Sequence, residues 1–414
     1  MSVTFTTRGA LQKSVLRQAN ERLILNAVRN NPTISRSDLS RITGLSPSSI
    51  SFIVNRLVRR GILTEEKLEK YSQVGRRPTA LRLATDSMLA ITLEIRTGGT
   101  RLALADLSGR FLRQKLIPWN SNPQVLAQRA HAAIRSMIEQ AGSSRVLGVG
   151  VGLPGSIERF SGRVIAAENL NWFNVDFGTP LRGRLQLPFY FENNARLSAL
   201  AEKWFAEPGS KPLQDFIFVA TAGGLGTGVF TGGHLLEGAT AVGGECGHII
   251  LHPDGLRCTC GNRGCWEQYA SDKALCRLYA EYAGLPDSTR CDAAGILDLA
   301  RQGDEAATRA LGEVADSLAL GFANLLMVFN PEAIIVGDFA ADAWDLIEAR
   351  IWAVLKGRAP RYALAPARIV PTTHASDSAL LGGASVVFSH FFTRFDNGGD
   401  SVRPGEVLLM QGAR

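Results

Sequence analysis

The chain has 414 residues, a formal net charge of +7 and 45% hydrophobic residues, which is enough apolar content for two or three globular domains and excludes a mostly disordered chain. It contains no run of 18 or more apolar residues, and its N-terminus lacks the apolar core of a secretion signal. We therefore expect a soluble protein of the cytoplasm that does not insert into a membrane.

The positive charge is concentrated at the N-terminal end. Residues 1–85 carry 15 Lys and Arg against 5 Asp and Glu, whereas the remainder carries 30 against 33. A small basic module on a mildly acidic body is typical of nucleic-acid binders, although a solvated basic face would carry the same charge. We expect a DNA-binding domain at residues 1–85, a larger body at residues 86–393 and a loose C-terminal tail at residues 394–414.

Three short helices are predicted between residues 20 and 61. The first covers residues 20–29, and the third shows apolar residues at helical spacing after Pro47. Cap residues mark the ends of the second and third helices: Ser35, Gly44, Ser46 and Gly61. The second and third helices together predict a helix-turn-helix, which offers the N-terminal end of its second helix to the major groove. A generic three-helix bundle is the alternative.

Six side chains are expected at the DNA. Four lie on the third helix and two on a wing made of strands at residues 62–64 and 79–83: Ser48, Ser49, Ser51, Arg56, Arg76 and Arg77. The two wing arginines stand in the segment Gly-Arg-Arg-Pro at residues 75–78, and Arg is drawn to the negative potential of a narrow minor groove. The alternative for this segment is a basic interdomain linker.

The body is predicted to alternate strands and helices. In chain order we expect strands at 89–95 and 101–107, a helix at 123–141, strands at 146–151 and 189–191, a helix at 197–204, a strand at 216–220, a helix at 312–329, a strand at 333–336, a helix at 342–355 and a strand at 369–372. Glycine-rich segments at 150–155 and 223–228 follow two of these strands. This pattern predicts an α/β body with room for two lobes and a ligand site at the strand ends.

One segment carries a metal-binding pattern, H-x9-C-x-C-x4-C, formed by His248, Cys258, Cys260 and Cys265. Three thiolates and one imidazole suit a tetrahedral, structural Zn2+. Chance cysteines or a disulfide pair are the alternative, which a reducing compartment disfavours. Cys246 either touches the metal or is a small buried residue, as we expect for Cys276 and Cys291.

Several segments in order and spacing resemble the ROK family of sugar kinases and sugar-responsive repressors: GVGVGLPG, ENLNW, FENNARLSALAE, AGGLGTGVFTGG, the zinc segment and FNPEAIIVGD. The N-terminal module is similar to that of the glucose, xylose and N-acetylglucosamine repressors. The resemblance implies a winged helix-turn-helix followed by a two-lobed actin-like (hexokinase-like) body, a sugar cleft between the lobes, and a homodimer or homotetramer.

The resemblance also implies which side chains contact the sugar: Asn193, Asn194, Glu245, His248 and Glu267. His248 could bind zinc through one ring nitrogen and a sugar hydroxyl through the other. The two glutamates would accept hydrogen bonds from sugar hydroxyls, or alternatively support the zinc loop.

Two departures from the kinase pattern predict that the chain is not an enzyme. Kinases of the family place an Asp, as general base, where this chain has Asn194, and an amide cannot take up a proton at neutral pH. The phosphate loop of the kinases aligns with residues 94–99, where Arg96 replaces a Gly that lets the backbone approach phosphate. A sugar kinase with an added DNA-binding domain stays as an alternative.

The resulting hypothesis is a DNA-binding repressor of carbohydrate uptake or catabolism genes. It would bind double-stranded operator DNA at an inverted repeat and respond to a sugar or phosphosugar in the cleft. A regulator sequestered by a sugar-transport protein is the second hypothesis.

Overall fold

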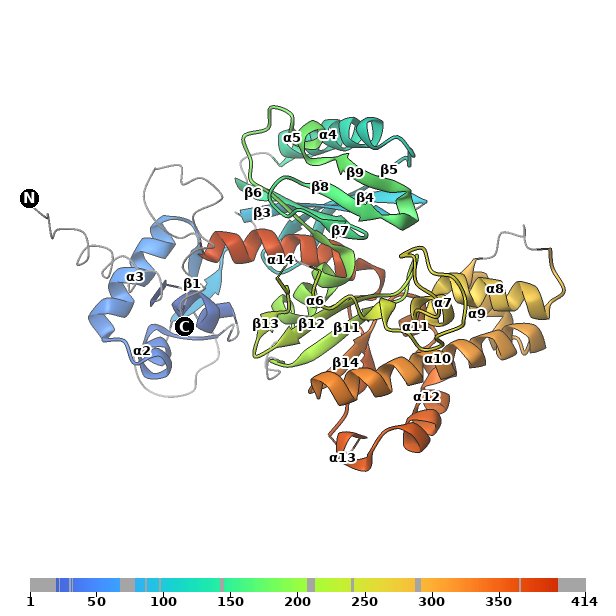
Figure 1. Cartoon of the computed structure of the whole chain (residues 1–414). Coiled ribbons are helices and arrows are strands. Elements are labelled where there is room, and N and C mark those ends of the chain that lie inside the picture. The colour runs from blue at the N-terminus through green and yellow to red at the C-terminus, as the bar shows by residue number, and fades with distance from the viewer. Residues whose placement is uncertain are drawn as a thin grey trace, which may run out of the picture.

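The computed structural model describes residues 20–393, apart from residues 22, 30, 32, 68–78, 86–87, 97, 142–144, 207–212, 240–241, 287–291 and 365. Figure 1 shows a small N-terminal domain beside a body of two lobes. Arg76, Arg77, Cys291 and the predicted tail lie outside the described residues.

The N-terminal domain is a winged helix-turn-helix. Residues 20–21 and 23–29 are helical, α2 (Arg36–Thr43) and α3 (Pro47–Arg59) follow, and β1 (Leu63–Lys67) pairs with β2 (Thr79–Leu83) as an antiparallel wing. The predicted caps are confirmed, because the Ser35 hydroxyl accepts from the Asp38 backbone and the Ser46 hydroxyl accepts from the Ser49 backbone. Gly44 ends α2 with φ of 70°, a left-handed conformation that favours glycine.

Lobe one is built on a five-stranded sheet with the strand order β10-β6-β3-β4-β5. The strands are β3 (Met88–Arg96), β4 (Gly99–Asp106), β5 (Phe111–Ile117), β6 (Arg145–Leu153) and β10 (Phe189–Asn193). β3, β4 and β5 are antiparallel, whereas β6 and β10 run parallel to β3. The other elements of the lobe are α4 (Pro123–Gln140), α5 (Gly178–Arg182), η2 (Glu168–Leu170) and a small sheet of β7 (Ser156–Ile157), β8 (Arg163–Ala167) and β9 (Trp172–Asp176).

Lobe two repeats the same strand pattern with the order β13-β12-β11-β14-β15. The strands are β11 (Phe216–Ala220), β12 (Gly226–Thr231), β13 (His234–Leu235), β14 (Ala333–Val336) and β15 (Ile369–Pro371). Again three antiparallel strands are followed by two parallel ones. The helical elements are η3 (Cys246–His248), α7 (Glu267–Ala270), α8 (Asp272–Tyr282), α9 (Ala293–Arg301), α10 (Glu305–Phe329), α11 (Phe339–Asp342), α12 (Trp344–Arg358) and α13 (Arg361–Leu364). The repeated sheet confirms the predicted two-lobed α/β body.

Helix α10 is long and apolar enough to cross a membrane by length and composition, with a mean hydropathy of 1.4. However, 61% of that stretch is buried inside lobe two, where residues such as Leu318 and Phe322 are fully enclosed. Packing in the core therefore accounts for its apolar character. The helix begins at Glu305, before the predicted residue 312, because Asp304 caps it.

Two helices lie between the lobes, namely α6 (Asn194–Trp204) and α14 (Ser378–Thr393) (Figure 1). α14, which follows η4 (Ala375–Asp377), packs on α6 and on β3 and β6. This close approach needs glycine, since a Cβ on Gly382 would lie 1.9 Å from the Leu197 carbonyl oxygen. The sequence patterns did not predict α8, α9, α14 or β5.

The N-terminal domain is packed against the body. Ile24, Leu25 and Leu81 of the small domain share one buried cluster with Ala384 and Phe388 of α14. Figure 1 shows the small domain at the end of α14, consistent with this contact. The DNA-binding domain and the helices between the lobes therefore form a continuous core.

Candidate functional site

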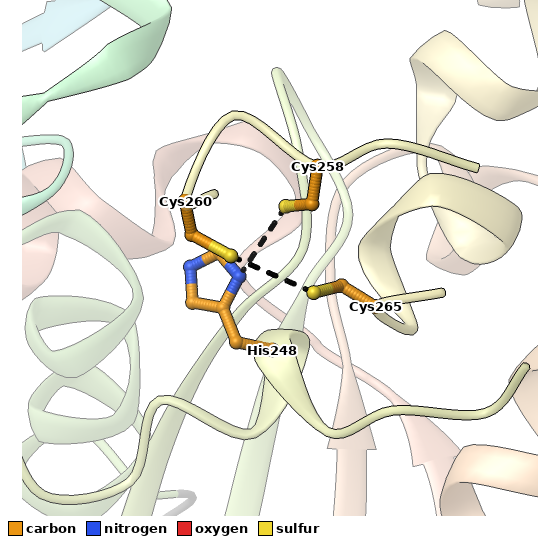
Figure 2. Close-up of side chains that lie close together, drawn as sticks. All are labelled: His248, Cys258, Cys260 and Cys265. Carbon is orange, nitrogen blue, oxygen red and sulfur yellow. Dashed lines mark hydrogen bonds between the residues drawn. The ribbon is translucent and has the colours of Figure 1, made fainter. Parts of the chain in front are cut away.

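His248, Cys258, Cys260 and Cys265 come together as one cluster (Figure 2), and their four ligand atoms all lie within 4.8 Å of one another. Zn–S bonds of about 2.3 Å in a tetrahedron would place neighbouring ligand atoms about 3.8 Å apart. The Sγ atoms of Cys260 and Cys265 are 3.6 Å apart, and Cys258 Sγ lies 3.7 Å from His248 Nδ1. The cluster therefore has the size and the donor set of a structural zinc site.

The backbone of this loop brings distant positions together. Two isolated β-bridges, Ile250 with Cys265 and Arg257 with Arg263, fold the segment back on itself. Trp266 follows the last cysteine, is fully buried, and donates from its indole nitrogen to the Ser317 carbonyl of α10 at 2.9 Å. The loop is therefore anchored in the core of lobe two before any metal is considered.

Cys246 and Cys276, the two other cysteines among the described residues, lie outside the cluster. Cys246 is buried at the start of η3, and Cys276 is partly buried on α8. Both positions agree with the prediction of small packed residues.

Glu267 borders the metal cluster. Its Oε1 accepts from Cys258 Sγ at 2.9 Å and lies 3.8 Å from His248 Nδ1. Burial, followed by the Glu267 carboxylate, raises the pKa of the Cys258 thiol, so a bound cation is what would hold this sulfur as a thiolate. Since Nδ1 of His248 faces the cluster, Nε2 is the ring nitrogen that can meet a ligand, as predicted.

Three carboxylates converge beside this cluster. Burial in the cleft raises the pKa of the Glu245 carboxyl, His248 and Arg196 oppose that rise, and Glu168 and Glu267 add to it. Glu168 lies on η2 of lobe one, whereas Glu245 and Glu267 belong to lobe two. Glu168 was not among the residues predicted for this region, although it stands in the segment ENLNW.

Asn193 and Asn194 lie where β10 turns into α6. Asn193 caps the helix, since its Oδ1 accepts from the Ala195 backbone at 2.8 Å and its Nδ2 donates to the Gly155 carbonyl at 3.1 Å. The amide oxygen of Asn193 is thus committed to backbone groups, whereas its nitrogen has a second N–H that a sugar hydroxyl could accept from.

Asn194 has a free acceptor. Its Nδ2 donates to the Ile95 carbonyl at 3.0 Å, while its Oδ1 is buried and has no hydrogen-bond partner among the described residues. A carbonyl can only accept, so the amide nitrogen must face Ile95 and the oxygen must face away from it. A buried acceptor without a partner is costly, and a ligand hydroxyl could satisfy it.

A network of buried charges surrounds Glu94, in the segment that we aligned with the kinase phosphate loop. Glu94 is fully buried on β3 and pairs with Arg96 and with Arg101, whose Nε lies 2.9 Å from the Glu94 carboxylate. Arg101 also reaches Asp377 at 2.8 Å, just before α14. Arg96 Nη2 lies 3.4 Å from Asp338 of lobe two, so this network bridges the lobes.

Both partners of the bridging pair are unusual. Burial by itself would lower the pKa of Arg96, but Glu94 and Asp338 outweigh it and raise that pKa above its usual value. Asp338 has φ of 57° and ψ of −138°, a conformation that disfavours residues with a side chain, and its carboxylate accepts from the Thr221 backbone at 3.0 Å. Arg96 therefore joins the two lobes through a pair of oppositely charged partners, Glu94 and Asp338.

A second network joins the lobes beside the candidate sugar site. Arg196 of α6 is buried, lies 3.0 Å from the Glu192 carboxylate and donates to the Gly243 carbonyl at 3.3 Å. Arg159 also pairs with Glu192 and reaches Glu237 at 2.6 Å. The sequence did not indicate either arginine as a bridging residue, because Gly243 and Glu237, which they reach, lie in a segment far from both.

The predicted DNA-contacting residues on α3 have different surroundings. Ser48 is exposed and Ser49 and Ser51 are half-buried near the N-terminal end of the helix. Arg56 turns inward and pairs with Glu21, a fully buried carboxylate of the first helix. A phosphate contact by Arg56 would therefore have to break this pair.

Comparisons with known proteins agree with these features. The chain matches the family model described as ROK family over residues 92–390 and the one described as winged helix-turn-helix DNA-binding over residues 17–64. It is 29% identical over 358 residues to a xylose repressor of Caldicellulosiruptor bescii, covering 83% of this chain and 89% of that one. It is 35% identical over 257 residues to a glucokinase of Thermotoga maritima, covering 58% of this chain and 78% of that one.

A solved structure described as a ROK family transcriptional regulator, homologous to the Escherichia coli MLC protein, superposes with a TM-score of 0.77 at 25% identity. That match covers 91% of this chain and 97% of the other, and so includes both the small domain and the body. The chain therefore belongs to the ROK family and is one of its DNA-binding transcriptional regulators, with a winged helix-turn-helix ahead of the ROK body.

Proposed function

We propose that this protein represses carbohydrate uptake or catabolism genes in the cytoplasm and that a sugar or phosphosugar in the cleft between its lobes controls its DNA affinity. Residues 1–85 would read the operator and residues 86–393 would sense the effector. The observation that carries the proposal is the unpartnered acceptor of Asn194, which lies at the start of a helix whose far end meets the DNA-binding domain.

The effector site would combine groups from both lobes. Asn194 Oδ1 and the carboxylates of Glu245 and Glu267 accept hydrogen bonds from hydroxyls, and His248 Nε2 offers a further polar contact. A polyhydroxylated ligand matches such a set, because each of its hydroxyls can donate one hydrogen bond.

The cleft is unsuited to phosphoryl transfer. Asn194 cannot act as a general base, a loss of about 10^2- to 10^4-fold in rate by itself. Arg96 and Arg101, paired with Glu94 and Asp338, fill the space where a nucleotide phosphate would have to approach the backbone. Sugar binding would therefore persist as a signal without chemistry.

A structural Zn2+ would be held by His248, Cys258, Cys260 and Cys265. When bound, it would supply a rigid anchor for the loop that carries Glu245 and Glu267, and no chemical step. The fit of the donor atoms to a tetrahedron supports this assignment.

Helix α6 offers a physical route from the effector to the DNA. Asn194 is its first residue, and Trp204 at its other end stacks under the Arg29 guanidinium at 4.2 Å and beside Phe392 of α14 at 5.7 Å. Arg29 Nη1 and Trp204 Nε1 are buried and lack hydrogen-bond partners among the residues that the structure describes, so this contact carries a desolvation cost. An effector that favours another lobe arrangement would shift this contact.

The operator would be an inverted repeat read by a symmetric homodimer or homotetramer. Two copies of α3 would then enter successive major grooves about 34–36 Å apart. A shift of the small domains relative to the body would change this spacing and so the DNA affinity.

The proposal is tested by fluorescence anisotropy with the full-length protein and an operator selected from random DNA. One class of sugar or phosphosugar should bind by calorimetry and change DNA affinity about 5- to 150-fold. A protein that binds the operator but no sugar would instead favour control by a sugar-transport protein, and one that binds no duplex DNA at low salt would refute the whole proposal.

A further inference from the structure

Helix α3 presents a large apolar side chain on its outer face. Phe52 is 60% exposed, whereas the apolar residues that fix the helix in its domain, such as Ile53 and Leu57, are buried. Phe52 falls outside the apolar stripe of the helix, so packing within the domain does not account for it. An exposed aromatic ring on an otherwise polar face indicates a binding role.

The neighbours of Phe52 on this face are polar or basic. Ser48, Asn55 and Arg59 are exposed and stand four residues before, three residues after and seven residues after Phe52. At 3.6 residues per turn, these four side chains lie within an arc of about 60°. Phe52 lies at one edge of this arc and, along the helix axis, between Ser48 and Asn55, on the face that a helix-turn-helix turns toward the major groove.

This face is held in a fixed orientation by contacts to the rest of the domain. Arg36 Nη2 of α2 donates to Asn55 Oδ1 at 2.6 Å, and Arg36 Nε lies 2.9 Å from Glu65 of the wing. The Arg56 guanidinium lies 5.9 Å from the Phe52 ring centroid on its other side. The ring is thus flanked on both sides while its outer edge stays open.

The only apolar group that base pairs display in the major groove is the 5-methyl group of thymine. A phenyl ring cannot pair with the hydrogen-bonding edges of bases, but it can bury this methyl group and exclude water from it. The serine and arginine side chains around Phe52 suit the adjoining phosphates, which favours DNA over an apolar protein partner.

We propose that Phe52 is a specificity-determining residue that reads a thymine methyl group in the operator. The inference rests on the proposed DNA-binding role of α3. It adds that Phe52 on this helix selects thymine over other bases. Each half-site should contain a thymine whose methyl group contributes to affinity and for which the protein distinguishes thymine from uracil.

The test uses the full-length protein and the operator selected from random DNA. Each thymine is replaced in turn by deoxyuridine, which removes only the methyl group, and affinity is measured by fluorescence anisotropy. Burying a methyl group contributes about as much as one CH2, so we expect about a fourfold loss at one thymine per half-site and none elsewhere. In Phe52→Ala the affinity for the thymine operator should fall, and the sensitivity to uracil at that position should disappear.

Ile42→Ala is the matched control, because Ile42 is 57% exposed on α2, in the same domain. This variant should keep the wild-type response to uracil. Phe52→Ala should also keep the wild-type slope of log K against log salt, since an apolar contact releases no counterions.

Equal uracil sensitivity in the wild type and Phe52→Ala, or no sensitivity at any thymine in the wild type, would overturn the inference. Neither result would contradict the proposed DNA-binding function, because the same titrations would still show operator binding. Loss of operator binding by the wild type would instead count against the proposed function.

Discussion

The Asn194 amide nitrogen donates to the Ile95 carbonyl at 3.0 Å, while its buried oxygen has no hydrogen-bond partner among the described residues. An ionised carboxylate at this position could not donate and would face that carbonyl with a second acceptor. The same single change that removes a general base thus also fixes the local hydrogen bonding. In the neighbouring loop, Arg96 forms ion pairs with Glu94 and Asp338.

Asn194→Asp should therefore destabilise the protein and should not restore kinase activity. The lost hydrogen bond and the apposed acceptors should lower the free energy of unfolding by about 1–3 kcal/mol. The deficit should shrink as the pH falls, because the protonated carboxyl can donate again. Urea unfolding at several pH values measures this, and a coupled assay with ATP and hexoses should show no turnover. Turnover at a rate typical of kinases would contradict our view of the cleft.

Helix α3 carries two arginines, Arg56 and Arg59, that lie three residues apart but have different environments. Arg56 turns into the domain and pairs with the buried Glu21, whereas Arg59 remains exposed near the end of the helix. We predicted Arg56 at the DNA because its position on α3 does not reveal its partner, Glu21, which belongs to another helix.

Arg56→Ala and Arg59→Ala should therefore differ in kind. Removing Arg56 leaves Glu21 buried without its partner, which should cost about 3–5 kcal/mol of stability. Removing Arg59 should leave stability nearly unchanged and reduce the slope of log K against log salt by about 0.9. Thermal melting and salt titrations of operator binding distinguish the two, and the opposite assignment would return Arg56 to the DNA surface.

The loop that carries the metal cluster, residues 248–266, is a second element. Backbone hydrogen bonds within the loop and the Trp266 anchor hold it to lobe two. A bound metal would add a cross-link among the four candidate ligands and so make the loop more rigid.

Removing the metal should loosen this loop while sparing the DNA-binding domain. We expect one Zn2+ per chain, a lower melting temperature after chelation, and loss of the effector response with operator binding retained at low salt. Cys260→Ser should reproduce these effects, whereas Cys276→Ser, outside the cluster, should keep full zinc content. A chain that melts identically with and without chelator would rule out a structural metal.

At the scale of the whole molecule, α6 and α14 connect the cleft to the DNA-binding domain. The buried cluster that joins the small domain to α14 leaves little independence between the two parts. Trp204 stands at the point where α6, α14 and the first helix of the DNA-binding domain meet.

Trp204→Leu should uncouple the effector from the DNA, because it removes the ring that stacks under Arg29. Effector affinity and DNA affinity measured separately should stay within about twofold of the wild type, while the ratio of DNA affinities with and without effector should move toward one. Trp352→Leu on α12 of lobe two is the control and should keep full coupling. Unchanged coupling in Trp204→Leu would exclude α6 as the route.

Features that depend on residues close together in the chain could be predicted without the structure. The caps of α2 and α3 were predictable, because a serine hydroxyl bonds a backbone group three residues away. The cluster of His248 and three cysteines was predictable because its members fall within one short segment. Spacing along the chain is sufficient for such features.

Contacts between distant side chains could not be predicted from the sequence. Arg96 and Asp338 are 242 positions apart, and Arg101 and Asp377 are 276 apart, so no local pattern indicates that they pair across the lobes. The pair of Arg56 with Glu21 and the contact of Arg29 with Trp204 likewise arise from packing between different helices. Strand order and helix packing set these distances, and they result from burying the whole chain at once rather than from any one segment of it.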